Sequence, residues 1–158
     1  MPLLNLTDAV ALRESLRSQN RKVVFTNGVF DLLHAGHVDY LEKARGLGEA
    51  LLVGVNGDDS ARQLKGSGRP FLPALDRARL IAALRCVEAA VIFEELTAGG
   101  LLQSLRPEIY VKGGDYRDKP LPESDAAREV GAQIILIDYL VGQSTSALIE
   151  KIARRAAP

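Results

Sequence analysis

Short, continuous apolar segments alternate with amphipathic segments along the 158-residue chain. The apolar segments are rich in Val, Ile and Leu and have few polar positions, which is typical of strands that are buried on both faces of a sheet. They predict strands at residues 22–26, 51–56, 87–93, 109–111 and 133–137. Apolar residues at helical spacing predict helices at residues 7–17, 38–47, 76–85, 97–105, 124–130 and 145–155. This alternation predicts an α/β fold with helices on both faces of the sheet.

We therefore expect a single Rossmann-like domain over residues 1–158, with a mostly parallel five-stranded sheet and a leading helix within residues 1–20. Twenty basic and twenty acidic residues give no net charge, so the sequence predicts neither a nucleic-acid nor a membrane partner. The single cysteine, Cys86, excludes an internal disulfide. Because no secretory signal and no run of about 18 apolar residues is present, we expect a cytoplasmic protein.

Polar or glycine-rich segments follow four of the predicted strands, at residues 27–37, 56–59, 112–116 and 142–146. In open α/β sheets, ligands bind at the carboxyl ends of the strands, where the strand order reverses. We therefore expect these four segments to meet at one site.

The only two histidines of the chain, His34 and His37, lie in the first of these segments. Imidazole donates hydrogen bonds to phosphate oxygens whether it is neutral or charged. Gly36 lacks a Cβ and would let a ligand approach the backbone, and the helix that follows would present N–H groups to an anion. A metal pair and a purely structural role are alternatives, but a metal would need Asp31 as its third ligand. The pattern favours phosphate binding.

The other segments are weak signals when taken singly. Residues 65–69 (Lys-Gly-Ser-Gly-Arg) are compatible with an exposed turn, and residues 144–146 (Ser-Thr-Ser) with a helix N-cap. Together they favour phosphoryl or nucleotidyl transfer, in which a protein mainly positions groups and stabilises charge. The sequence contains no Walker motif and no Gly-x-Gly-x-x-Gly after the first strand, which argues against P-loop kinases and dinucleotide dehydrogenases.

Residues 28–37 (Gly-Val-Phe-Asp-Leu-Leu-His-Ala-Gly-His) match the G-x-F-D-x-x-H-x-G-H signature of the cytidylyltransferase-like nucleotidyltransferases. The resemblance extends over residues 22–151, which would form the catalytic core of an HxGH nucleotidyltransferase fold. It looks closest to the adenylyltransferases of D-glycero-β-D-manno-heptose 1-phosphate, on residues 25–31, 64–70, 111–116 and 144–149, with Pro73 and Arg77. Two positions depart from the pattern of many relatives: Ser146 replaces a Thr, and Glu88 replaces an Asp.

The resemblance implies transfer of AMP from ATP to a sugar 1-phosphate, with release of pyrophosphate and formation of ADP-heptose. It implies three catalytic residues: His34, His37 and Lys65. The nucleotide-binding residues would be Asn27, Gly28, Val29, Phe30, Gly36, Arg85, Val111, Gly113, Asp115, Ser144, Thr145 and Ser146. The residues that bind the acceptor or its phosphate would be Asp31, Asn56, Asp58, Arg69, Arg77 and Lys112.

The expected cofactor is Mg²⁺, bound mainly through substrate phosphates and water, so no metal site built from protein side chains is predicted. The expected partners are ATP and a phosphorylated sugar. A separate sugar kinase is expected as well, because the kinase domain that often precedes this domain in relatives is absent from the sequence. Relatives also suggest a homodimer.

Several alternatives stay open at the level of sequence. CTP could replace ATP, because backbone groups would contact the base, and the acceptor could be glycerol 3-phosphate or FMN. A regulatory module that binds a nucleotide without turnover is a different class of protein, and intact His34, His37 and Lys65 argue against it. Nucleic-acid binding has only the basic residues within 151–155 to support it.

Overall fold

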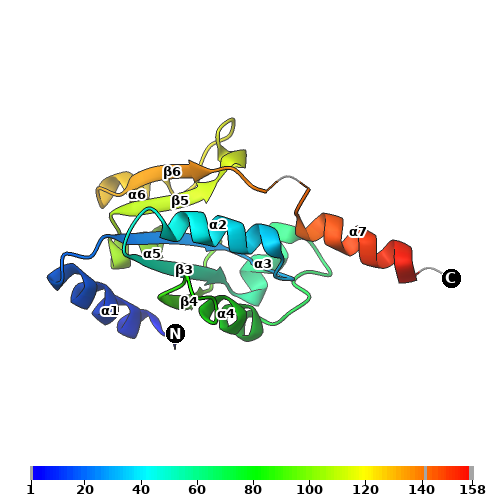
Figure 1. Cartoon of the computed structure of the whole chain (residues 1–158), viewed down its shortest axis with the longest axis horizontal. Helices are drawn as coiled ribbons and strands as arrows, with labels where there is room; N and C mark the ends of the chain where they lie inside the picture. Colours follow the sequence, from blue (N-terminus) through cyan, green and yellow to red (C-terminus); the bar gives the residue numbers. More distant parts are fainter. Residues whose placement is uncertain (1, 141, 157–158) are drawn as a thin grey trace.

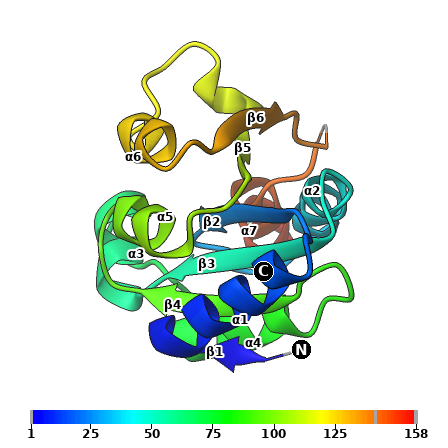
Figure 2. The ribbon, with the colours of Figure 1, turned by 90° about the vertical axis from the view of Figure 1, so that its left-hand side faces the viewer.

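The sheet of the protein is entirely parallel. The structure, a computed structural model, describes residues 2–140 and 142–156. Its strands are β1 (Leu3–Leu4), β2 (Val23–Gly28), β3 (Ala50–Asn56), β4 (Ala89–Phe93), β5 (Ile109–Gly113) and β6 (Gln133–Ile137). They lie in the order β1-β4-β3-β2-β5-β6, and every neighbouring pair is parallel (Figure 2). The predicted α/β class is confirmed. The predicted number of five strands is wrong, because the two-residue edge strand β1 is too short to give a pattern.

Helices cover both faces of this sheet (Figure 1). They are α1 (Leu6–Ser18), α2 (Ala35–Arg45), α3 (Asp58–Lys65), α4 (Ala74–Ala82), α5 (Gly99–Leu105), α6 (Ser124–Glu129) and α7 (Thr145–Ala156), with a 3₁₀ turn at Gly114–Tyr116. Helices α1, α5 and α6 pack on one face, and α2 and α4 pack on the other. Helix α3 was not predicted from the sequence. It buries only Ser60 and Ala61, so its sequence has no apolar stripe to predict it.

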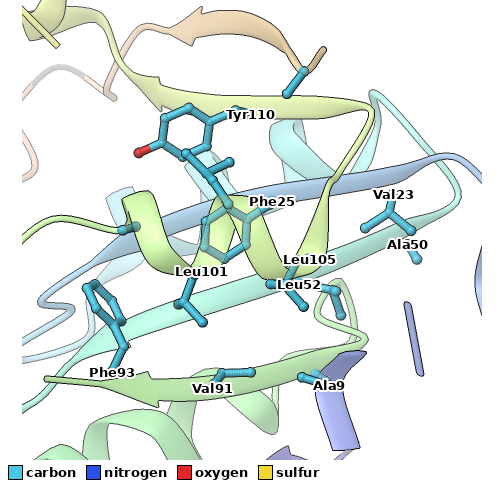
Figure 3. Close-up of a cluster of buried hydrophobic side chains, with 14 of the residues drawn as sticks. Ala9, Val23, Phe25, Ala50, Leu52, Val91, Phe93, Leu101, Leu105 and Tyr110 are labelled. Atoms are coloured by element: carbon cyan, nitrogen blue, oxygen red, sulfur yellow. The ribbon is translucent and has the colours of Figure 1, made fainter. Parts of the chain in front are cut away.

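Alternate residues of each strand enter different apolar clusters, because successive side chains of a strand point to opposite faces. Phe25 of β2 and Tyr110 of β5 stack with their ring centroids 5.8 Å apart on the α5 side (Figure 3). Their neighbours Val24 and Val111 are buried in the cluster on the α2 side. This register decides which side of the sheet each polar residue faces at the carboxyl ends of the strands.

Strand β2 lies between β3 and β5, and the strand order reverses there. From β2 the chain adds β3 and then β4 on one side, and it then crosses to β5 and β6 on the other side. The segments after β2 and β5 therefore flank the switch point of the sheet. Helix α7 begins near this edge and extends away from the sheet (Figure 1). Within the described residues, no helix has both the length and the apolar character that a bilayer span requires.

Candidate functional site

A cavity of about 620 Å³ opens at the carboxyl ends of the strands. All four of the segments that the sequence singled out contribute to its wall, so their predicted convergence is confirmed. The predicted site residues that line it are Asn27, Gly28, Val29, Phe30, Asp31, His34, Gly36, His37, Asn56, Lys65, Arg69, Lys112, Gly113, Asp115, Ser144, Thr145 and Ser146. The volume is within the range of small-molecule sites in proteins.

The two imidazoles are held side by side at the start of α2. His34 is the N-cap residue, and its Nδ1 accepts a hydrogen bond of 3.1 Å from the Gly36 N–H. The Nδ1 of His37 accepts a longer one, of 3.4 Å, from the His34 N–H. Because each Nδ1 is an acceptor, this hydrogen-bond pattern assigns the proton of each neutral ring to Nε2. The rings stack with centroids 3.9 Å apart, so the cavity wall carries two adjacent Nε2–H donors.

Burial favours the neutral form of both imidazoles. Burial lowers the pKa of His37 to about 4, with further lowering by the charges of His34 and Lys65. The charge of Asp31 acts in the opposite direction but does not offset their combined effect. Burial also lowers the pKa of His34. The pair therefore offers hydrogen bonds to an anion without a formal charge of its own.

These shifts predict how His37 titrates. In the ligand-free protein, the His37 ring is expected to titrate near pH 4, below the ordinary value of about 6.5. Because the folded state then binds fewer protons than the unfolded state, stability is lost as the pH falls from about 6.5 to about 4. Histidine ring resonances followed by NMR between pH 3 and 8 measure this pKa, and a His34→Gln variant assigns the two signals. A His37 midpoint at or above 6.5 would contradict the burial of the ring.

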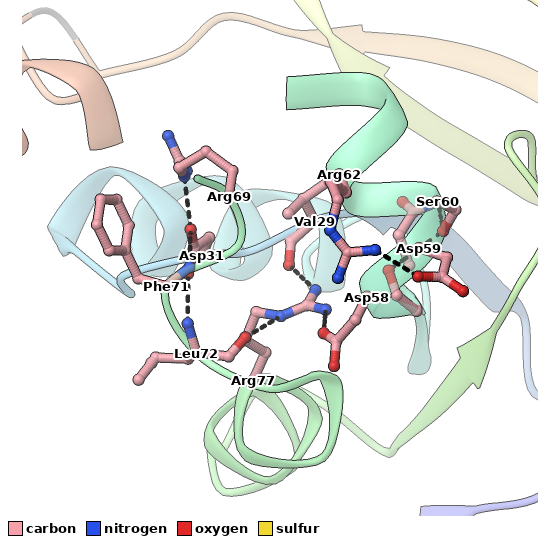
Figure 4. A network of polar contacts seen from close by, with 12 residues as sticks. Val29, Asp31, Asp58, Asp59, Ser60, Arg62, Arg69, Phe71, Leu72 and Arg77 are labelled. Carbon is pink, nitrogen blue, oxygen red and sulfur yellow. Dashed lines mark hydrogen bonds and ion pairs between the residues drawn. The ribbon is translucent and has the colours of Figure 1, made fainter. Parts of the chain in front are cut away.

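Asp31 ties the loop after β2 to the loop before α4 (Figure 4). Its buried carboxylate accepts hydrogen bonds from Arg69 Nε at 2.7 Å, from the Phe71 N–H at 2.9 Å and from the Leu72 N–H at 3.1 Å. Burial alone would raise the pKa of Asp31, but these hydrogen bonds and the charge of Arg69 lower it. The carboxylate is thus occupied by protein donors. Asp31 positions Arg69 at the cavity, whereas the sequence predicted a contact of Asp31 with the acceptor.

Two residues predicted to contact the acceptor lie outside the cavity. The Arg77 guanidinium is fully buried and donates to the Val29 carbonyl at 2.6 Å, to the Leu72 carbonyl at 2.9 Å and to the Asp58 carboxylate at 2.8 Å (Figure 4). These bonds correct the prediction that Arg77 clamps a phosphate and that Asp58 lies beside the sugar. The pair instead holds the loop after β2 against α3 and α4.

Two residues predicted to bind the nucleotide also lie outside the cavity. Arg85 is exposed and precedes β4, so it lies toward the amino ends of the strands. Glu88 also precedes β4 and pairs with Arg21 at 3.6 Å. Val111 is buried within β5, and its carbonyl accepts hydrogen bonds from Thr26 Oγ1 at 2.9 Å and from the Tyr40 hydroxyl at 3.2 Å. The structure therefore corrects the predicted nucleotide contacts of Arg85 and Val111.

Two glycines of the site are required by protein packing. A Cβ at Gly36 would lie 2.9 Å from the Cβ of Gln143, so Gly36 allows α2 to approach the segment before α7. The sequence had suggested that this space served a ligand. A side chain at Gly113 would overlap the ring of Tyr139, which packs 5.8 Å from the ring of Tyr40.

The structure adds Tyr40, Leu96, Thr97, Lys119, Pro122, Glu123 and Tyr139, which sequence reasoning missed, and Leu64, Tyr116 and Gln143, which lie in the predicted segments but were not named as site residues. Tyr40 follows His37 by one helical turn, so its spacing could have identified it. Glu123 and Tyr139 come from segments outside the recognised motifs, and only the fold brings them to the cavity.

Basic groups dominate the charged wall of the cavity. Lys65, Arg69, Lys112 and Lys119 line it. Lys112 is 8% exposed, its Nζ lies 3.3 Å from Asn27 Oδ1, and burial lowers its pKa. Of the acidic groups on this wall, Asp31 is bonded to Arg69, Asp115 pairs with Lys119 at 2.9 Å, and Glu123 is buried. Among residues 2–140 and 142–156, no group of three or more His, Cys, Asp and Glu side chains is arranged to hold a metal ion. The arrangement suits an anionic ligand.

The chain is similar to a known protein family and to curated proteins. The family model described as cytidylyltransferase-like matches residues 25–147. A curated protein of a Nitratiruptor species, named bifunctional protein HldE, is 48% identical over 141 residues, covering 89% of this chain and 30% of its own length. The protein of the same name from Helicobacter pylori (strain G27) is 50% identical over 143 residues, covering 90% of this chain and 30% of its own length. The chain thus spans about 30% of the curated relatives that it matches.

Solved structures share the fold. The crystal structure of the lipopolysaccharide core biosynthesis protein from Thermoplasma volcanium GSS1 has a TM-score of 0.61 and is 27% identical, covering 76% of this chain and 97% of that one. A pantoate–β-alanine ligase from Francisella tularensis has a TM-score of 0.59 at 14% identity, covering 97% of this chain and 80% of that one. At that identity the likeness concerns the fold alone.

Proposed function

The chain belongs to the cytidylyltransferase-like family, and from this premise we propose that it transfers AMP from ATP to a sugar 1-phosphate, with heptose 1-phosphate as the acceptor. One observation carries the proposal: the paired Nε2–H donors of His34 and His37 lie on the wall of a cavity that is rich in basic groups. Neutral donors of this kind suit a polyphosphate, whose charge the neighbouring cations balance.

The parts of the cavity suggest where the nucleotide lies. The phosphates would accept hydrogen bonds from His34 and His37. The β- and γ-phosphates would also meet the start of α7, where Thr145 Oγ1 donates to the Asp31 carbonyl at 2.9 Å. The adenine would face the backbone around Gly113 and Asp115.

The reaction is an in-line displacement at the α-phosphorus. An oxygen of the acceptor phosphate forms the new bond to the α-phosphorus, and the bond from that phosphorus to the oxygen bridging to the β-phosphate breaks. Pyrophosphate leaves with the bonding electron pair. His34 and His37 would stabilise the charge that develops on the α-phosphate oxygens, and Lys65 would balance the five-coordinate transition state.

The residues at the cavity fit a Mg²⁺ ion that phosphate oxygens and water would hold, because the carboxylates of Asp31 and Asp115 are engaged with Arg69 and Lys119 and, among the described residues of the wall, only Glu123 remains as a single carboxylate. When bound with the triphosphate, Mg²⁺ would neutralise part of its charge.

The proposal that heptose 1-phosphate is the acceptor is supported by the named relatives and by the sequence resemblance. Relatives that are 48% and 50% identical are named bifunctional protein HldE, and we propose that this chain corresponds to their nucleotidyltransferase part. A sugar 1-phosphate is itself made by a phosphoryl-transfer reaction, and we propose that a sugar kinase supplies it. A separate kinase, the homodimer and the cytoplasmic location stay predictions.

A pyrophosphate-release panel tests the proposed function. ATP and CTP are each combined with heptose 1-phosphate, glycerol 3-phosphate and FMN in the presence of Mg²⁺. We expect the highest kcat/KM for ATP with heptose 1-phosphate, together with formation of ADP-heptose. Preferred use of CTP or of another acceptor would replace the proposed substrates, and nucleotide binding without any product would identify a regulatory module.

A further inference from the structure

The buried carboxyl group of Glu123 lacks part of its hydrogen bonding. Glu123 directly precedes α6, is 4% exposed and lines the cavity. Its Oε1 accepts a hydrogen bond of 3.2 Å from the Ala98 N–H, at the start of α5. Its Oε2 is buried and has no hydrogen-bond partner among the described residues. Leaving a buried acceptor unsatisfied is costly, so this oxygen is available to a donor from a bound ligand.

The surroundings of Glu123 form a polar subsite on the α5 side of the sheet edge. Asn27 and Lys112 lie two residues beyond Phe25 and Tyr110, so they face the same side as that aromatic pair. The Tyr110 hydroxyl donates to Asn27 Oδ1 at 2.7 Å. The cluster therefore combines a carboxylate, an amide and a buried ammonium group at one end of the cavity.

Asn56 extends this subsite along the next strand. A Cβ at Gly54 would lie 3.0 Å from Leu101 of α5 and 3.2 Å from the Asn27 Cβ, so Asn56, two residues further, faces the α5 side as well. The histidines, by contrast, belong to α2 and its N-cap, and α2 covers the opposite face of the sheet. The cavity thus has a phosphate-binding side with the imidazoles and a second side that mixes donors and acceptors.

We propose that Glu123 determines acceptor specificity by accepting hydrogen bonds from adjacent hydroxyl groups of the sugar, with Lys112 and Asn27 as flanking polar groups. This inference rests on the proposed function, and it names the side chain that would recognise the polyol part of its acceptor. A carboxylate repels phosphate but accepts well from hydroxyl groups, and Oε2 of Glu123 is free to accept from them, whereas Oε1 already accepts from the Ala98 N–H. The donors that the site needs are those that a polyol supplies.

A Glu123→Gln variant tests this role. The amide oxygen of Gln keeps an acceptor for the Ala98 N–H, whereas its NH₂ group replaces the unpartnered acceptor with a donor. We expect the acceptor KM to rise by about 10- to 100-fold, with the KM for ATP and the melting temperature nearly unchanged. Glu129→Gln is the matched control, because Glu129 is exposed on α6 and outside the cavity. An unchanged acceptor KM, or a rise confined to the KM for ATP, overturns the proposal.

Two further measurements distinguish acceptor recognition by Glu123 from a purely structural role. They also distinguish failure of this proposal from failure of the proposed reaction. Calorimetric binding of the sugar phosphate alone does not need turnover, and Glu123→Gln should weaken it to the same degree. Lack of sugar phosphate binding by the wild type overturns the subsite, whereas binding without transfer overturns only the proposed reaction. The wild type should discriminate against acceptors that lack one hydroxyl group, measured as the loss of kcat/KM, more strongly than Glu123→Gln does. Equal discrimination, or a fall in melting temperature alone, would mean that Glu123 only supports α5.

Discussion

A His37→Ala variant is expected to release pyrophosphate about 10²- to 10³-fold more slowly than the wild type at saturating substrates. The reason is that His37 would offer its Nε2–H to the α-phosphate as charge develops there, and alanine offers no donor. The measurement is kcat by a coupled pyrophosphate assay, with the KM for ATP determined in parallel. We expect the effect to fall mainly on kcat, since the interaction strengthens in the transition state.

The loss should not come from unfolding. Besides stacking on His34, which is itself partly exposed, His37 contributes one long hydrogen bond of 3.4 Å and an edge-to-face contact with Phe30 at 5.6 Å, so its removal should change the melting temperature little. Lys43→Ala is the matched control, because Lys43 is an exposed residue of the same helix outside the cavity. A His37→Ala variant that keeps near-wild-type kcat would remove the proposed role.

The two amide substitutions test which nitrogen carries the proton. The amide of glutamine occupies a place near Nε2 of histidine, whereas that of asparagine lies near Nδ1. Because Nδ1 of His37 accepts from the His34 N–H, His37→Gln should recover more activity than His37→Asn. The reverse order would contradict the assigned tautomer.

The fold was predictable where buried segments have an apolar sequence pattern. Strand β3 is buried along its whole length, and its apolar run predicted it to within one residue. Strand β1 and helix α3 were missed for the same physical reason. The first has two residues, and the second buries Ser60 and Ala61, so neither produces an apolar pattern.

The site was predictable where its residues follow strand ends, as with His34, His37 and Lys112. Residue type alone did not distinguish basic residues that line the ligand cavity from basic residues that stabilise the fold. Arg69 lines the cavity and Arg77 is fully buried, although the sequence predicted the same phosphate-binding role for both. Glu123 carries no motif, and its place at the cavity follows from the packing of α6 on α5.

Lys65→Ala is expected to lower kcat by at least about 100-fold, while the affinity for ATP changes little. Lys65 is exposed at the carboxyl end of α3 and lines the cavity. Gly66 and Gly68, with φ of 96° and 89°, follow it in backbone conformations that favour glycine. A flexible cation on such a segment suits charge that appears only in the transition state, because its compact ammonium group can follow the reacting phosphate.

The split between kcat and KM decides what Lys65 does. A role in the transition state lowers kcat and kcat/KM equally, whereas uniform binding of ATP raises KM and leaves kcat unchanged. Lys65→Arg should restore part of the rate, because the charge returns on a bulkier and more rigid group. Arg62→Ala is the control on the same helix, since Arg62 pairs with Asp59 outside the cavity. If Lys65→Ala raises only the KM for ATP, Lys65 is a ground-state binding group, and another cation of the cavity wall, such as Arg69, must balance the five-coordinate phosphorus.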